Sequence, residues 1–162
     1  MNVECIPRDK GLYILLGYVT KDVSINVGRL GTILFRRGFY LYIGSAKGAG
    51  GLYTRLKRHL LRSKKTRWHI DYLTVNPHFK PLFIFYTTNL DLSEDIIVST
   101  LVNHGFKIAV KGFGSTDDVK VESHLLYTQE EPLKTIVVKV LQAVKKLGKE
   151  FNVINLNKTL IV

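Results

Sequence analysis

Cationic side chains that could bind phosphate gather in one short stretch of the chain. Seven of the 13 residues between positions 55 and 67 are Lys or Arg, and none is acidic. They are Arg55, Lys57, Arg58, Arg62, Lys64, Lys65 and Arg67. His59 follows Arg55 by four residues, so the two side chains would share one face of a helix. Such a block is typical of a protein that binds a nucleic-acid backbone, and the alternative is a solvated helix face without a partner.

The positive charge is confined to the first part of the chain. The 162 residues include 24 Lys and Arg against 13 Asp and Glu, a formal charge of +11. Residues 1–67 hold 14 of the cations and three of the acids, whereas residues 68–162 hold ten of each sign. We therefore expect one nucleic-acid-binding face, to which Lys47 also contributes, beside a neutral remainder.

Composition excludes several classes of protein. Hydrophobic residues make up 46% of the chain, which predicts a packed globule and not a disordered basic tail. Cys5 is the single cysteine, so neither an internal disulfide nor an all-cysteine zinc site can form. The first residues lack the pattern of a signal peptide, and the longest apolar runs are far shorter than the roughly 18 to 20 residues of a membrane helix. We expect a cytoplasmic protein with no membrane contact.

Common motifs for phosphate and zinc binding are missing. The glycine-rich segment of residues 44–51 contains no Gly-Lys-Ser/Thr, which a Walker A loop requires. The five histidines have no pair three or four residues apart, so a preformed zinc site is not expected. A cysteine nucleophile would have to be Cys5, close to the chain terminus, and is disfavoured.

The candidate residues must be positioned by strands and helices that the hydrophobic pattern predicts. Apolar and aromatic runs predict strands over Gly11–Val19, Phe39–Gly44, Pro81–Tyr86, Phe106–Val110 and Phe151–Leu156, with further strand pieces within residues 23–36.

Helices are predicted between and after these strands. Leucines at every fourth position predict a helix over Leu52–Leu61. Asp91 as N-cap, with Glu94 three residues on, predicts a helix over Asp91–Asn103. An apolar stripe from Leu133 to Leu147 predicts a C-terminal helix whose stripe is core or a subunit interface.

Two tripeptides stand beside the basic block. Gly11-Leu12-Tyr13 opens the first predicted strand, and Tyr42-Ile43-Gly44 closes a later one. Together with Arg55 and His59, this order resembles the GIY-YIG nuclease superfamily, which is named for the two tripeptides. The chain is most similar to a branch with an extended hairpin, a Trp-His-Ile-Asp-Tyr-Leu segment and a Gly-Phe-Gly-Ser turn, here residues 68–73 and 112–115. The resemblance covers about residues 11–127.

The resemblance implies roles for individual residues. One of Tyr13 and Tyr42 would act as the general base or orient it, and Arg55 would bind the scissile phosphate. A phenol has an ordinary pKa of about 10, so a tyrosine base needs nearby cations that lower its pKa. His59 could hydrogen-bond to water, to a tyrosine or to phosphate. Glu94 matches the metal-binding glutamate of the superfamily, which implies one Mg²⁺ or Mn²⁺ ion per site.

Three further residues match positions of that branch and could belong to the site, namely His69, Asp117 and His124. Each candidate also has a structural alternative. The two tyrosines could be ordinary strand aromatics, Arg55 one more surface cation, and Glu94 the capping-box partner of Asp91.

We expect an α/β protein of the α+β type, with a small, mostly antiparallel central sheet flanked by helices. Residues 1–128 would form the GIY-YIG-like domain, and residues 129–162 a helix and strand that pack on it or on a partner subunit. Tyr13 and Tyr42 are much further apart than in the better-known nucleases, so an insertion must fold out of the hairpin.

The favoured function is a metal-dependent endonuclease that hydrolyses phosphodiester bonds in DNA, with DNA repair as a setting. The first alternative is a module of the same fold that binds DNA or RNA without cleaving it. Two observations support this alternative: no asparagine clearly fills a position downstream of Glu94 that the better-known nucleases often use, and Glu94 itself could be a capping residue. The second alternative is a structural protein that forms a homodimer through its C-terminal helix.

Overall fold

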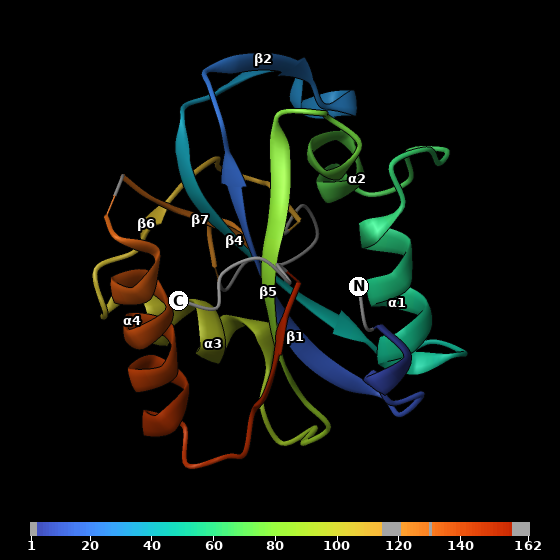
Figure 1. The fold of residues 1–162 in the computed structure, drawn as a ribbon, viewed down its shortest axis with the longest axis vertical. Helices are drawn as coiled ribbons and strands as arrows, with labels where there is room; N and C mark the ends of the chain where they lie inside the picture. Colours follow the sequence, from blue (N-terminus) through green and yellow to red (C-terminus); the bar gives the residue numbers. More distant parts are fainter. Residues whose placement is uncertain (1–2, 115–120, 130, 157–162) are drawn as a thin grey trace.

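Three long strands form the centre of the sheet (Figure 1). The structure is a computed structural model that describes residues 3–114, 121–129 and 131–156. β1 (Gly11–Val19) lies between β4 (Gly38–Ala46) and β5 (Phe79–Thr87) and pairs antiparallel with both. A strand that is apolar along its whole length suits this central position, because both of its faces are covered. The strand predicted over residues 11–19 is confirmed at both of its ends.

Three short strands complete a six-stranded sheet of order β6-β7-β4-β1-β5-β8. They are β6 (Lys107–Ile108), β7 (Leu125–Thr128) and β8 (Asn152–Asn155), and every pairing is antiparallel. β2 (Val23–Asn26) and β3 (Thr32–Phe35) form a separate hairpin joined by the 3-10 turn η2 (Gly28–Leu30), and the 3-10 turn η1 (Val3–Cys5) precedes β1. The predicted α+β fold is confirmed, and the insertion expected between the tyrosines is the β2–β3 hairpin.

Helices cover both faces of the sheet (Figure 1). α1 (Gly51–Leu60) and α2 (His69–Thr74) lie on one face, and α3 (Glu94–Val102) and α4 (Leu133–Lys146) on the other. Side chains of β1 alternate between two hydrophobic cores, with Tyr13 and Leu15 packing in the same core as α1 and α2. Leu12 and Ile14 pack in the core that contains α3 and α4. The tyrosine face of β1 is therefore the face that α1 covers.

The start of α3 differs from the prediction. The helix begins at Glu94, and the N-cap is Ser93, whose hydroxyl accepts a hydrogen bond from the Ile96 amide, so the proposed Asp91 cap is wrong. Leu92 before the cap and Ile97 in the first turn are buried in the same core, as in a hydrophobic staple. Burial of Leu92 fixes the entry of the chain into the helix and places Glu94 at its first position.

The C-terminal segment completes the same core and sheet. The apolar stripe of α4 is core, because Ile136, Val140 and Val144 are buried against the sheet. β8 pairs with β5 through Ile84 and Ile154 and thereby extends the sheet at one edge. In the ranges that the structure describes, no helix is long and apolar enough to cross a membrane.

Candidate functional site

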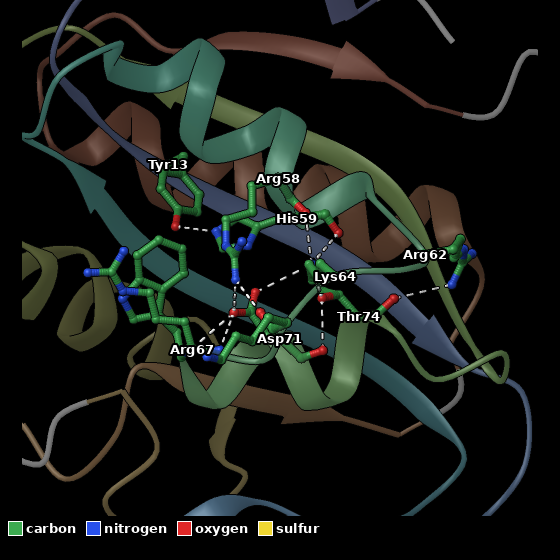
Figure 2. A network of polar contacts seen from close by, with 10 residues as sticks. Tyr13, Arg58, His59, Arg62, Lys64, Arg67, Asp71 and Thr74 are labelled. Carbon is green, nitrogen blue, oxygen red and sulfur yellow. Dashed lines mark hydrogen bonds and ion pairs between the residues drawn. The ribbon is translucent and has the colours of Figure 1, made fainter.

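Tyr13, Tyr42 and His59 form one buried aromatic cluster, called the tyrosine cluster below. The Tyr13 hydroxyl oxygen lies 2.7 Å from His59 Nε2 (Figure 2). The ring centroids of the two tyrosines are 6.3 Å apart, and those of Tyr42 and His59 are 5.9 Å apart. The exposed fractions are 0% for Tyr13, 2% for His59 and 7% for Tyr42. Three of the predicted catalytic side chains therefore meet beneath α1.

Strand register explains why these tyrosines meet. Tyr13 stands opposite Gly44 across the β1–β4 pair, and Leu15 stands opposite Tyr42, so the two tyrosines are diagonal neighbours on one face. A Cβ atom at Gly44 would lie 2.4 Å from the Tyr13 hydroxyl oxygen. The last glycine of the second tripeptide is thus required because the Tyr13 ring lies directly across it.

The protonation states of the tyrosine cluster differ from the expectation. Burial raises the pKa of Tyr13 well above its usual value, and the charge of Tyr42 raises it further. Burial also raises the pKa of Tyr42 to about 12, although the Arg55 cation opposes the shift. The expected lowering of the phenol pKa by nearby cations is therefore wrong, because desolvation exceeds the effect of Arg55. Both phenols are protonated at neutral pH.

His59 is neutral in this environment. Burial lowers its pKa to about 3, and the cations Lys64 and Arg55 add to the effect. Arg55 interacts with the Tyr13 oxygen as a cationic hydrogen-bond donor, and the Tyr13 hydroxyl and His59 Nε2 share a second hydrogen bond whose donor is set by the His59 tautomer. The His59 Nδ1 atom is buried without a hydrogen-bond partner. Polar contacts therefore run from Arg55 through Tyr13 to His59.

Arg55 is held by an aromatic ring as well as by Tyr13. Its guanidinium carbon lies 3.9 Å from the centroid of the Trp68 ring, and that of Arg58 lies 4.9 Å from the same centroid. Arginine stacked on tryptophan is a favourable cation–π arrangement that also fixes the plane of the guanidinium. Trp68 therefore positions Arg55 and Arg58, a contact that the sequence, which placed Trp68 only in a motif, did not predict.

Asp71 organises the basic segment, and its role was not predicted. Its carboxylate is fully buried and accepts a hydrogen bond from Arg58 at 2.8 Å, with the Lys64 ammonium at 3.3 Å (Figure 2). The backbone amides of Arg67 and Trp68 also donate to it. Burial alone would raise the pKa of Asp71, but these hydrogen bonds hold it below the usual value. In the sequence, one feature could have indicated this role: Asp71 is the first acidic residue after the basic block of residues 55–67.

Two of the predicted nucleic-acid-binding cations make contacts within the fold, and one of them, Lys64, is buried. The side chain of Lys64 is 2% exposed, so the structure does not present it to a phosphate backbone. Arg62 lies beyond the end of α1, at the far side of the network from Tyr13, and donates to the Phe79 carbonyl at 2.7 Å (Figure 2). Five of the predicted cations are exposed, namely Lys47, Lys57, Arg62, Lys65 and Arg67.

Glu94 faces the same region from α3. Its carboxylate raises the pKa values of both Tyr13 and Tyr42 and lies 4.0 Å from the Lys47 ammonium. The side chain of Glu94 is 18% exposed. A single accessible carboxylate suits a hard cation that keeps several waters, as Mg²⁺ does. Within the described ranges, no group of three or more His, Cys, Asp or Glu side chains gathers as a closed metal cage.

The further predicted histidines lie beside Tyr42. His69 Nδ1 accepts a hydrogen bond from the Gly114 amide at 3.0 Å, and a Cβ atom at Gly114 would touch both Tyr42 and His124. His124 Nε2 lies 3.9 Å from a carboxylate oxygen of Asp95, which follows Glu94 in α3. His69 and His124 thus brace the loop that packs on Tyr42. The third predicted residue, Asp117, lies outside the described residues.

Comparison with known proteins gives a family. No curated protein and no solved structure matches the chain. A family model described as "Domain of unknown function DUF123" matches residues 12–147. The matched span runs from β1 to the end of α4 and includes the tyrosine cluster, Arg55 and Glu94. Because this span is most of the chain, the protein belongs to the family of the domain of unknown function DUF123.

Proposed function

We propose that the protein is a metal-dependent endonuclease of the GIY-YIG type that hydrolyses phosphodiester bonds in DNA, with DNA repair as a setting. One observation carries this proposal. Tyr13, Tyr42, Arg55, His59 and Glu94 come from four separate elements and act electrostatically on one another. Two charged side chains, Arg55 and Glu94, thus lie close enough to act on the same pair of buried tyrosines.

The chemistry follows from the charges and protonation states. Arg55 is fixed by Trp68 and Tyr13 and offers its guanidinium to the scissile phosphate. Tyr42 is the more exposed tyrosine and, being protonated, would hydrogen-bond to and orient the attacking water. Tyr13 is locked by His59 and sets the position of Arg55. Glu94 would hold one Mg²⁺ or Mn²⁺ ion, which when bound supplies positive charge at the phosphate.

The second candidate is a module that binds DNA or RNA without cleaving it. The observation that favours it is the protonated state of both phenols, since neither tyrosine is poised as a general base. Arg55 and the exposed cations would still bind the phosphate backbone in this case.

A nicking assay decides between the two candidates. Supercoiled plasmid and branched DNA are incubated with the protein in Mg²⁺, Mn²⁺ or EDTA. We expect nicking only with metal, and a loss of about 100-fold or more for Tyr42→Phe and for Glu94→Gln. Glu150→Gln, at an exposed carboxylate far along the chain, is the matched control and should cut normally.

DNA binding is measured in parallel for the same variants. Salt-sensitive binding without cleavage by either metal would refute the endonuclease and leave the binding module. Binding that does not depend on salt would refute both candidates, because phosphate contacts release counterions.

A further inference from the structure

A pocket of about 290 Å³ lies immediately beside Arg55. It is formed where β4 ends, by the small residues that connect β4 to α1, by the first turns of α1 and by the half-buried Trp68. Its lining residues are Ser45, Ala46, Lys47, Gly48, Ala49, Gly51, Thr54, Arg55, Arg58 and Trp68. The volume is close to the lower end of small-molecule sites, about 300 Å³, so it would take one nucleotide and not a base pair within a duplex.

The electrostatics of the pocket favour an anion. Lys47, Arg55 and Arg58 line it, and no acidic side chain does. The backbone amides at the start of α1 are already occupied, since Leu52 N donates to the Asp9 carbonyl and Tyr53 N to the Pro7 carbonyl. An anion in this pocket would therefore be bound by Lys47 and Arg55, since Arg58 is paired with Asp71, and not by the helix terminus.

One wall of the pocket is flat and aromatic in character. The Arg55 guanidinium carbon lies over the Trp68 ring, 3.9 Å from its centroid, which brings a planar cation and an aromatic ring together in this wall. Nucleobases that are not paired stack on arginine planes and on aromatic rings, because every base has a π face. A cationic pocket with such a wall has the two features that an unpaired nucleotide needs, phosphate binding and base stacking.

We propose that this pocket binds one unpaired nucleotide of a DNA strand, with its phosphate on Lys47 and Arg55 and its base on the Arg55–Trp68 stack. The inference rests on the proposed function for its choice of DNA and names the substrate class of the same site. The preferred substrate is then single-stranded DNA, or a strand that leaves a duplex, next to the scissile phosphate.

Trp68 is the single tryptophan of the chain, so its fluorescence reports directly on the pocket. Three ligands of equal length are titrated in EDTA, where no cleavage can occur: a single strand, the same single strand with abasic sites, and a duplex. We expect the single strand to change Trp68 emission at concentrations at least 10-fold lower than either other ligand, since each stacked base contributes measurably to affinity.

Two variants test the place of binding without touching the predicted catalytic residues. Gly48 has no positive φ, and a Cβ atom there would meet open space, so Gly48→Leu can fill the pocket without backbone strain. Ala49→Leu is a second pocket-filling variant at an exposed residue. Both should weaken single-strand binding at least 10-fold, while Lys146→Ala, at an exposed lysine on α4, should leave it unchanged.

Several results would overturn the inference. Equal affinity for the abasic strand would mean that the pocket binds phosphate alone, and equal affinity for the duplex would mean that it does not select an unpaired nucleotide. Unchanged binding by both leucine variants would place the strand elsewhere. This test is independent of the endonuclease proposal. A protein that never cuts DNA can still bind the single strand selectively. An endonuclease that binds and cuts all substrates equally would contradict the inference about the pocket.

Discussion

Acidification is expected to destabilise the fold through His59. The histidine is 2% exposed and packs against Tyr13, Tyr42, Arg55 and Lys64. Burial and the neighbouring cations lower its pKa to about 3 in the folded protein, whereas an unfolded chain restores the ordinary pKa of about 6.5. As the pH falls below that value, the unfolded state takes up a proton and the folded state does not. Stability therefore decreases from the unfolded pKa down to the folded pKa.

The size of the effect follows from the two pKa values. Between pH 7 and pH 5, the protonation of the unfolded state at this one residue lowers the free energy of unfolding by about 2 kcal/mol. His69 contributes a loss of the same sign, because burial lowers its pKa as well. Asp71 does not contribute in this range, since its effect begins only near the unfolded carboxyl pKa. The contribution of His59 is therefore obtained by comparing the pH-dependent loss of unfolding free energy between the wild type and a His59 variant.

The assay is urea unfolding at pH 7 and at pH 5, followed by circular dichroism, for the wild type and for His59→Gln. Glutamine keeps an acceptor for the Tyr13 hydroxyl and cannot take up a proton. The wild type should lose about 2 kcal/mol more than the variant over this pH range. If both proteins lose the same amount, burial does not hold His59 neutral in the folded protein, and the reasoning is refuted.

Three further outcomes are expected. Asp71→Asn removes the charge that pairs with two cations inside the protein and should lower the free energy of unfolding by about 3 kcal/mol in urea titrations, and a drop below about 1 kcal/mol would contradict the buried pairing. Lys57→Ala should reduce the slope of log affinity for DNA against log salt by about 1, whereas an unchanged slope would exclude Lys57 from the phosphate contact. Gly17→Ala places a Cβ atom 2.1 Å from the Phe79 ring and should destabilise by about 1–3 kcal/mol, so an unaltered melting temperature would contradict this packing.

The regular elements were predictable wherever the sequence pattern was long and had one explanation. The apolar run of residues 11–19 can be buried on both faces only in the middle of a sheet, and its bounds were predicted correctly. The start of α3 was predicted wrongly, because Asp91 and Ser93 are both good N-cap residues and the local sequence does not distinguish between them. The choice is made by Leu92, which is buried in the core and forces the helix to begin after Ser93.

The sequence predicted which residues lie in the site, but it did not predict the protonation states of the two tyrosines. Tyr13, Tyr42 and Arg55 were identified from the resemblance of the two tripeptides and the basic segment to a known family, and they do lie together. Their ionisation depends on how deeply the tyrosines are buried, and depth is a property of the assembled sheet and helices. The sequence places cations near the phenols and so suggests a lowered pKa, whereas desolvation reverses the sign.

A count of charges in the sequence also overstates the number of cationic side chains that a nucleic acid can contact. The basic block has seven cations, but Arg58 and Lys64 are paired with Asp71, and Arg62 is bonded to backbone carbonyls. The single Asp71 carboxylate offsets one of the two positive charges of Arg58 and Lys64, so this group contributes less field outside the protein than two free cations would. The charge left for a ligand is therefore concentrated at Arg55 and at the exposed lysines and arginine around it. A strand bound there should be selected by the shape of the pocket and the Arg55–Trp68 stack more than by total charge, which is why the abasic strand is the decisive ligand.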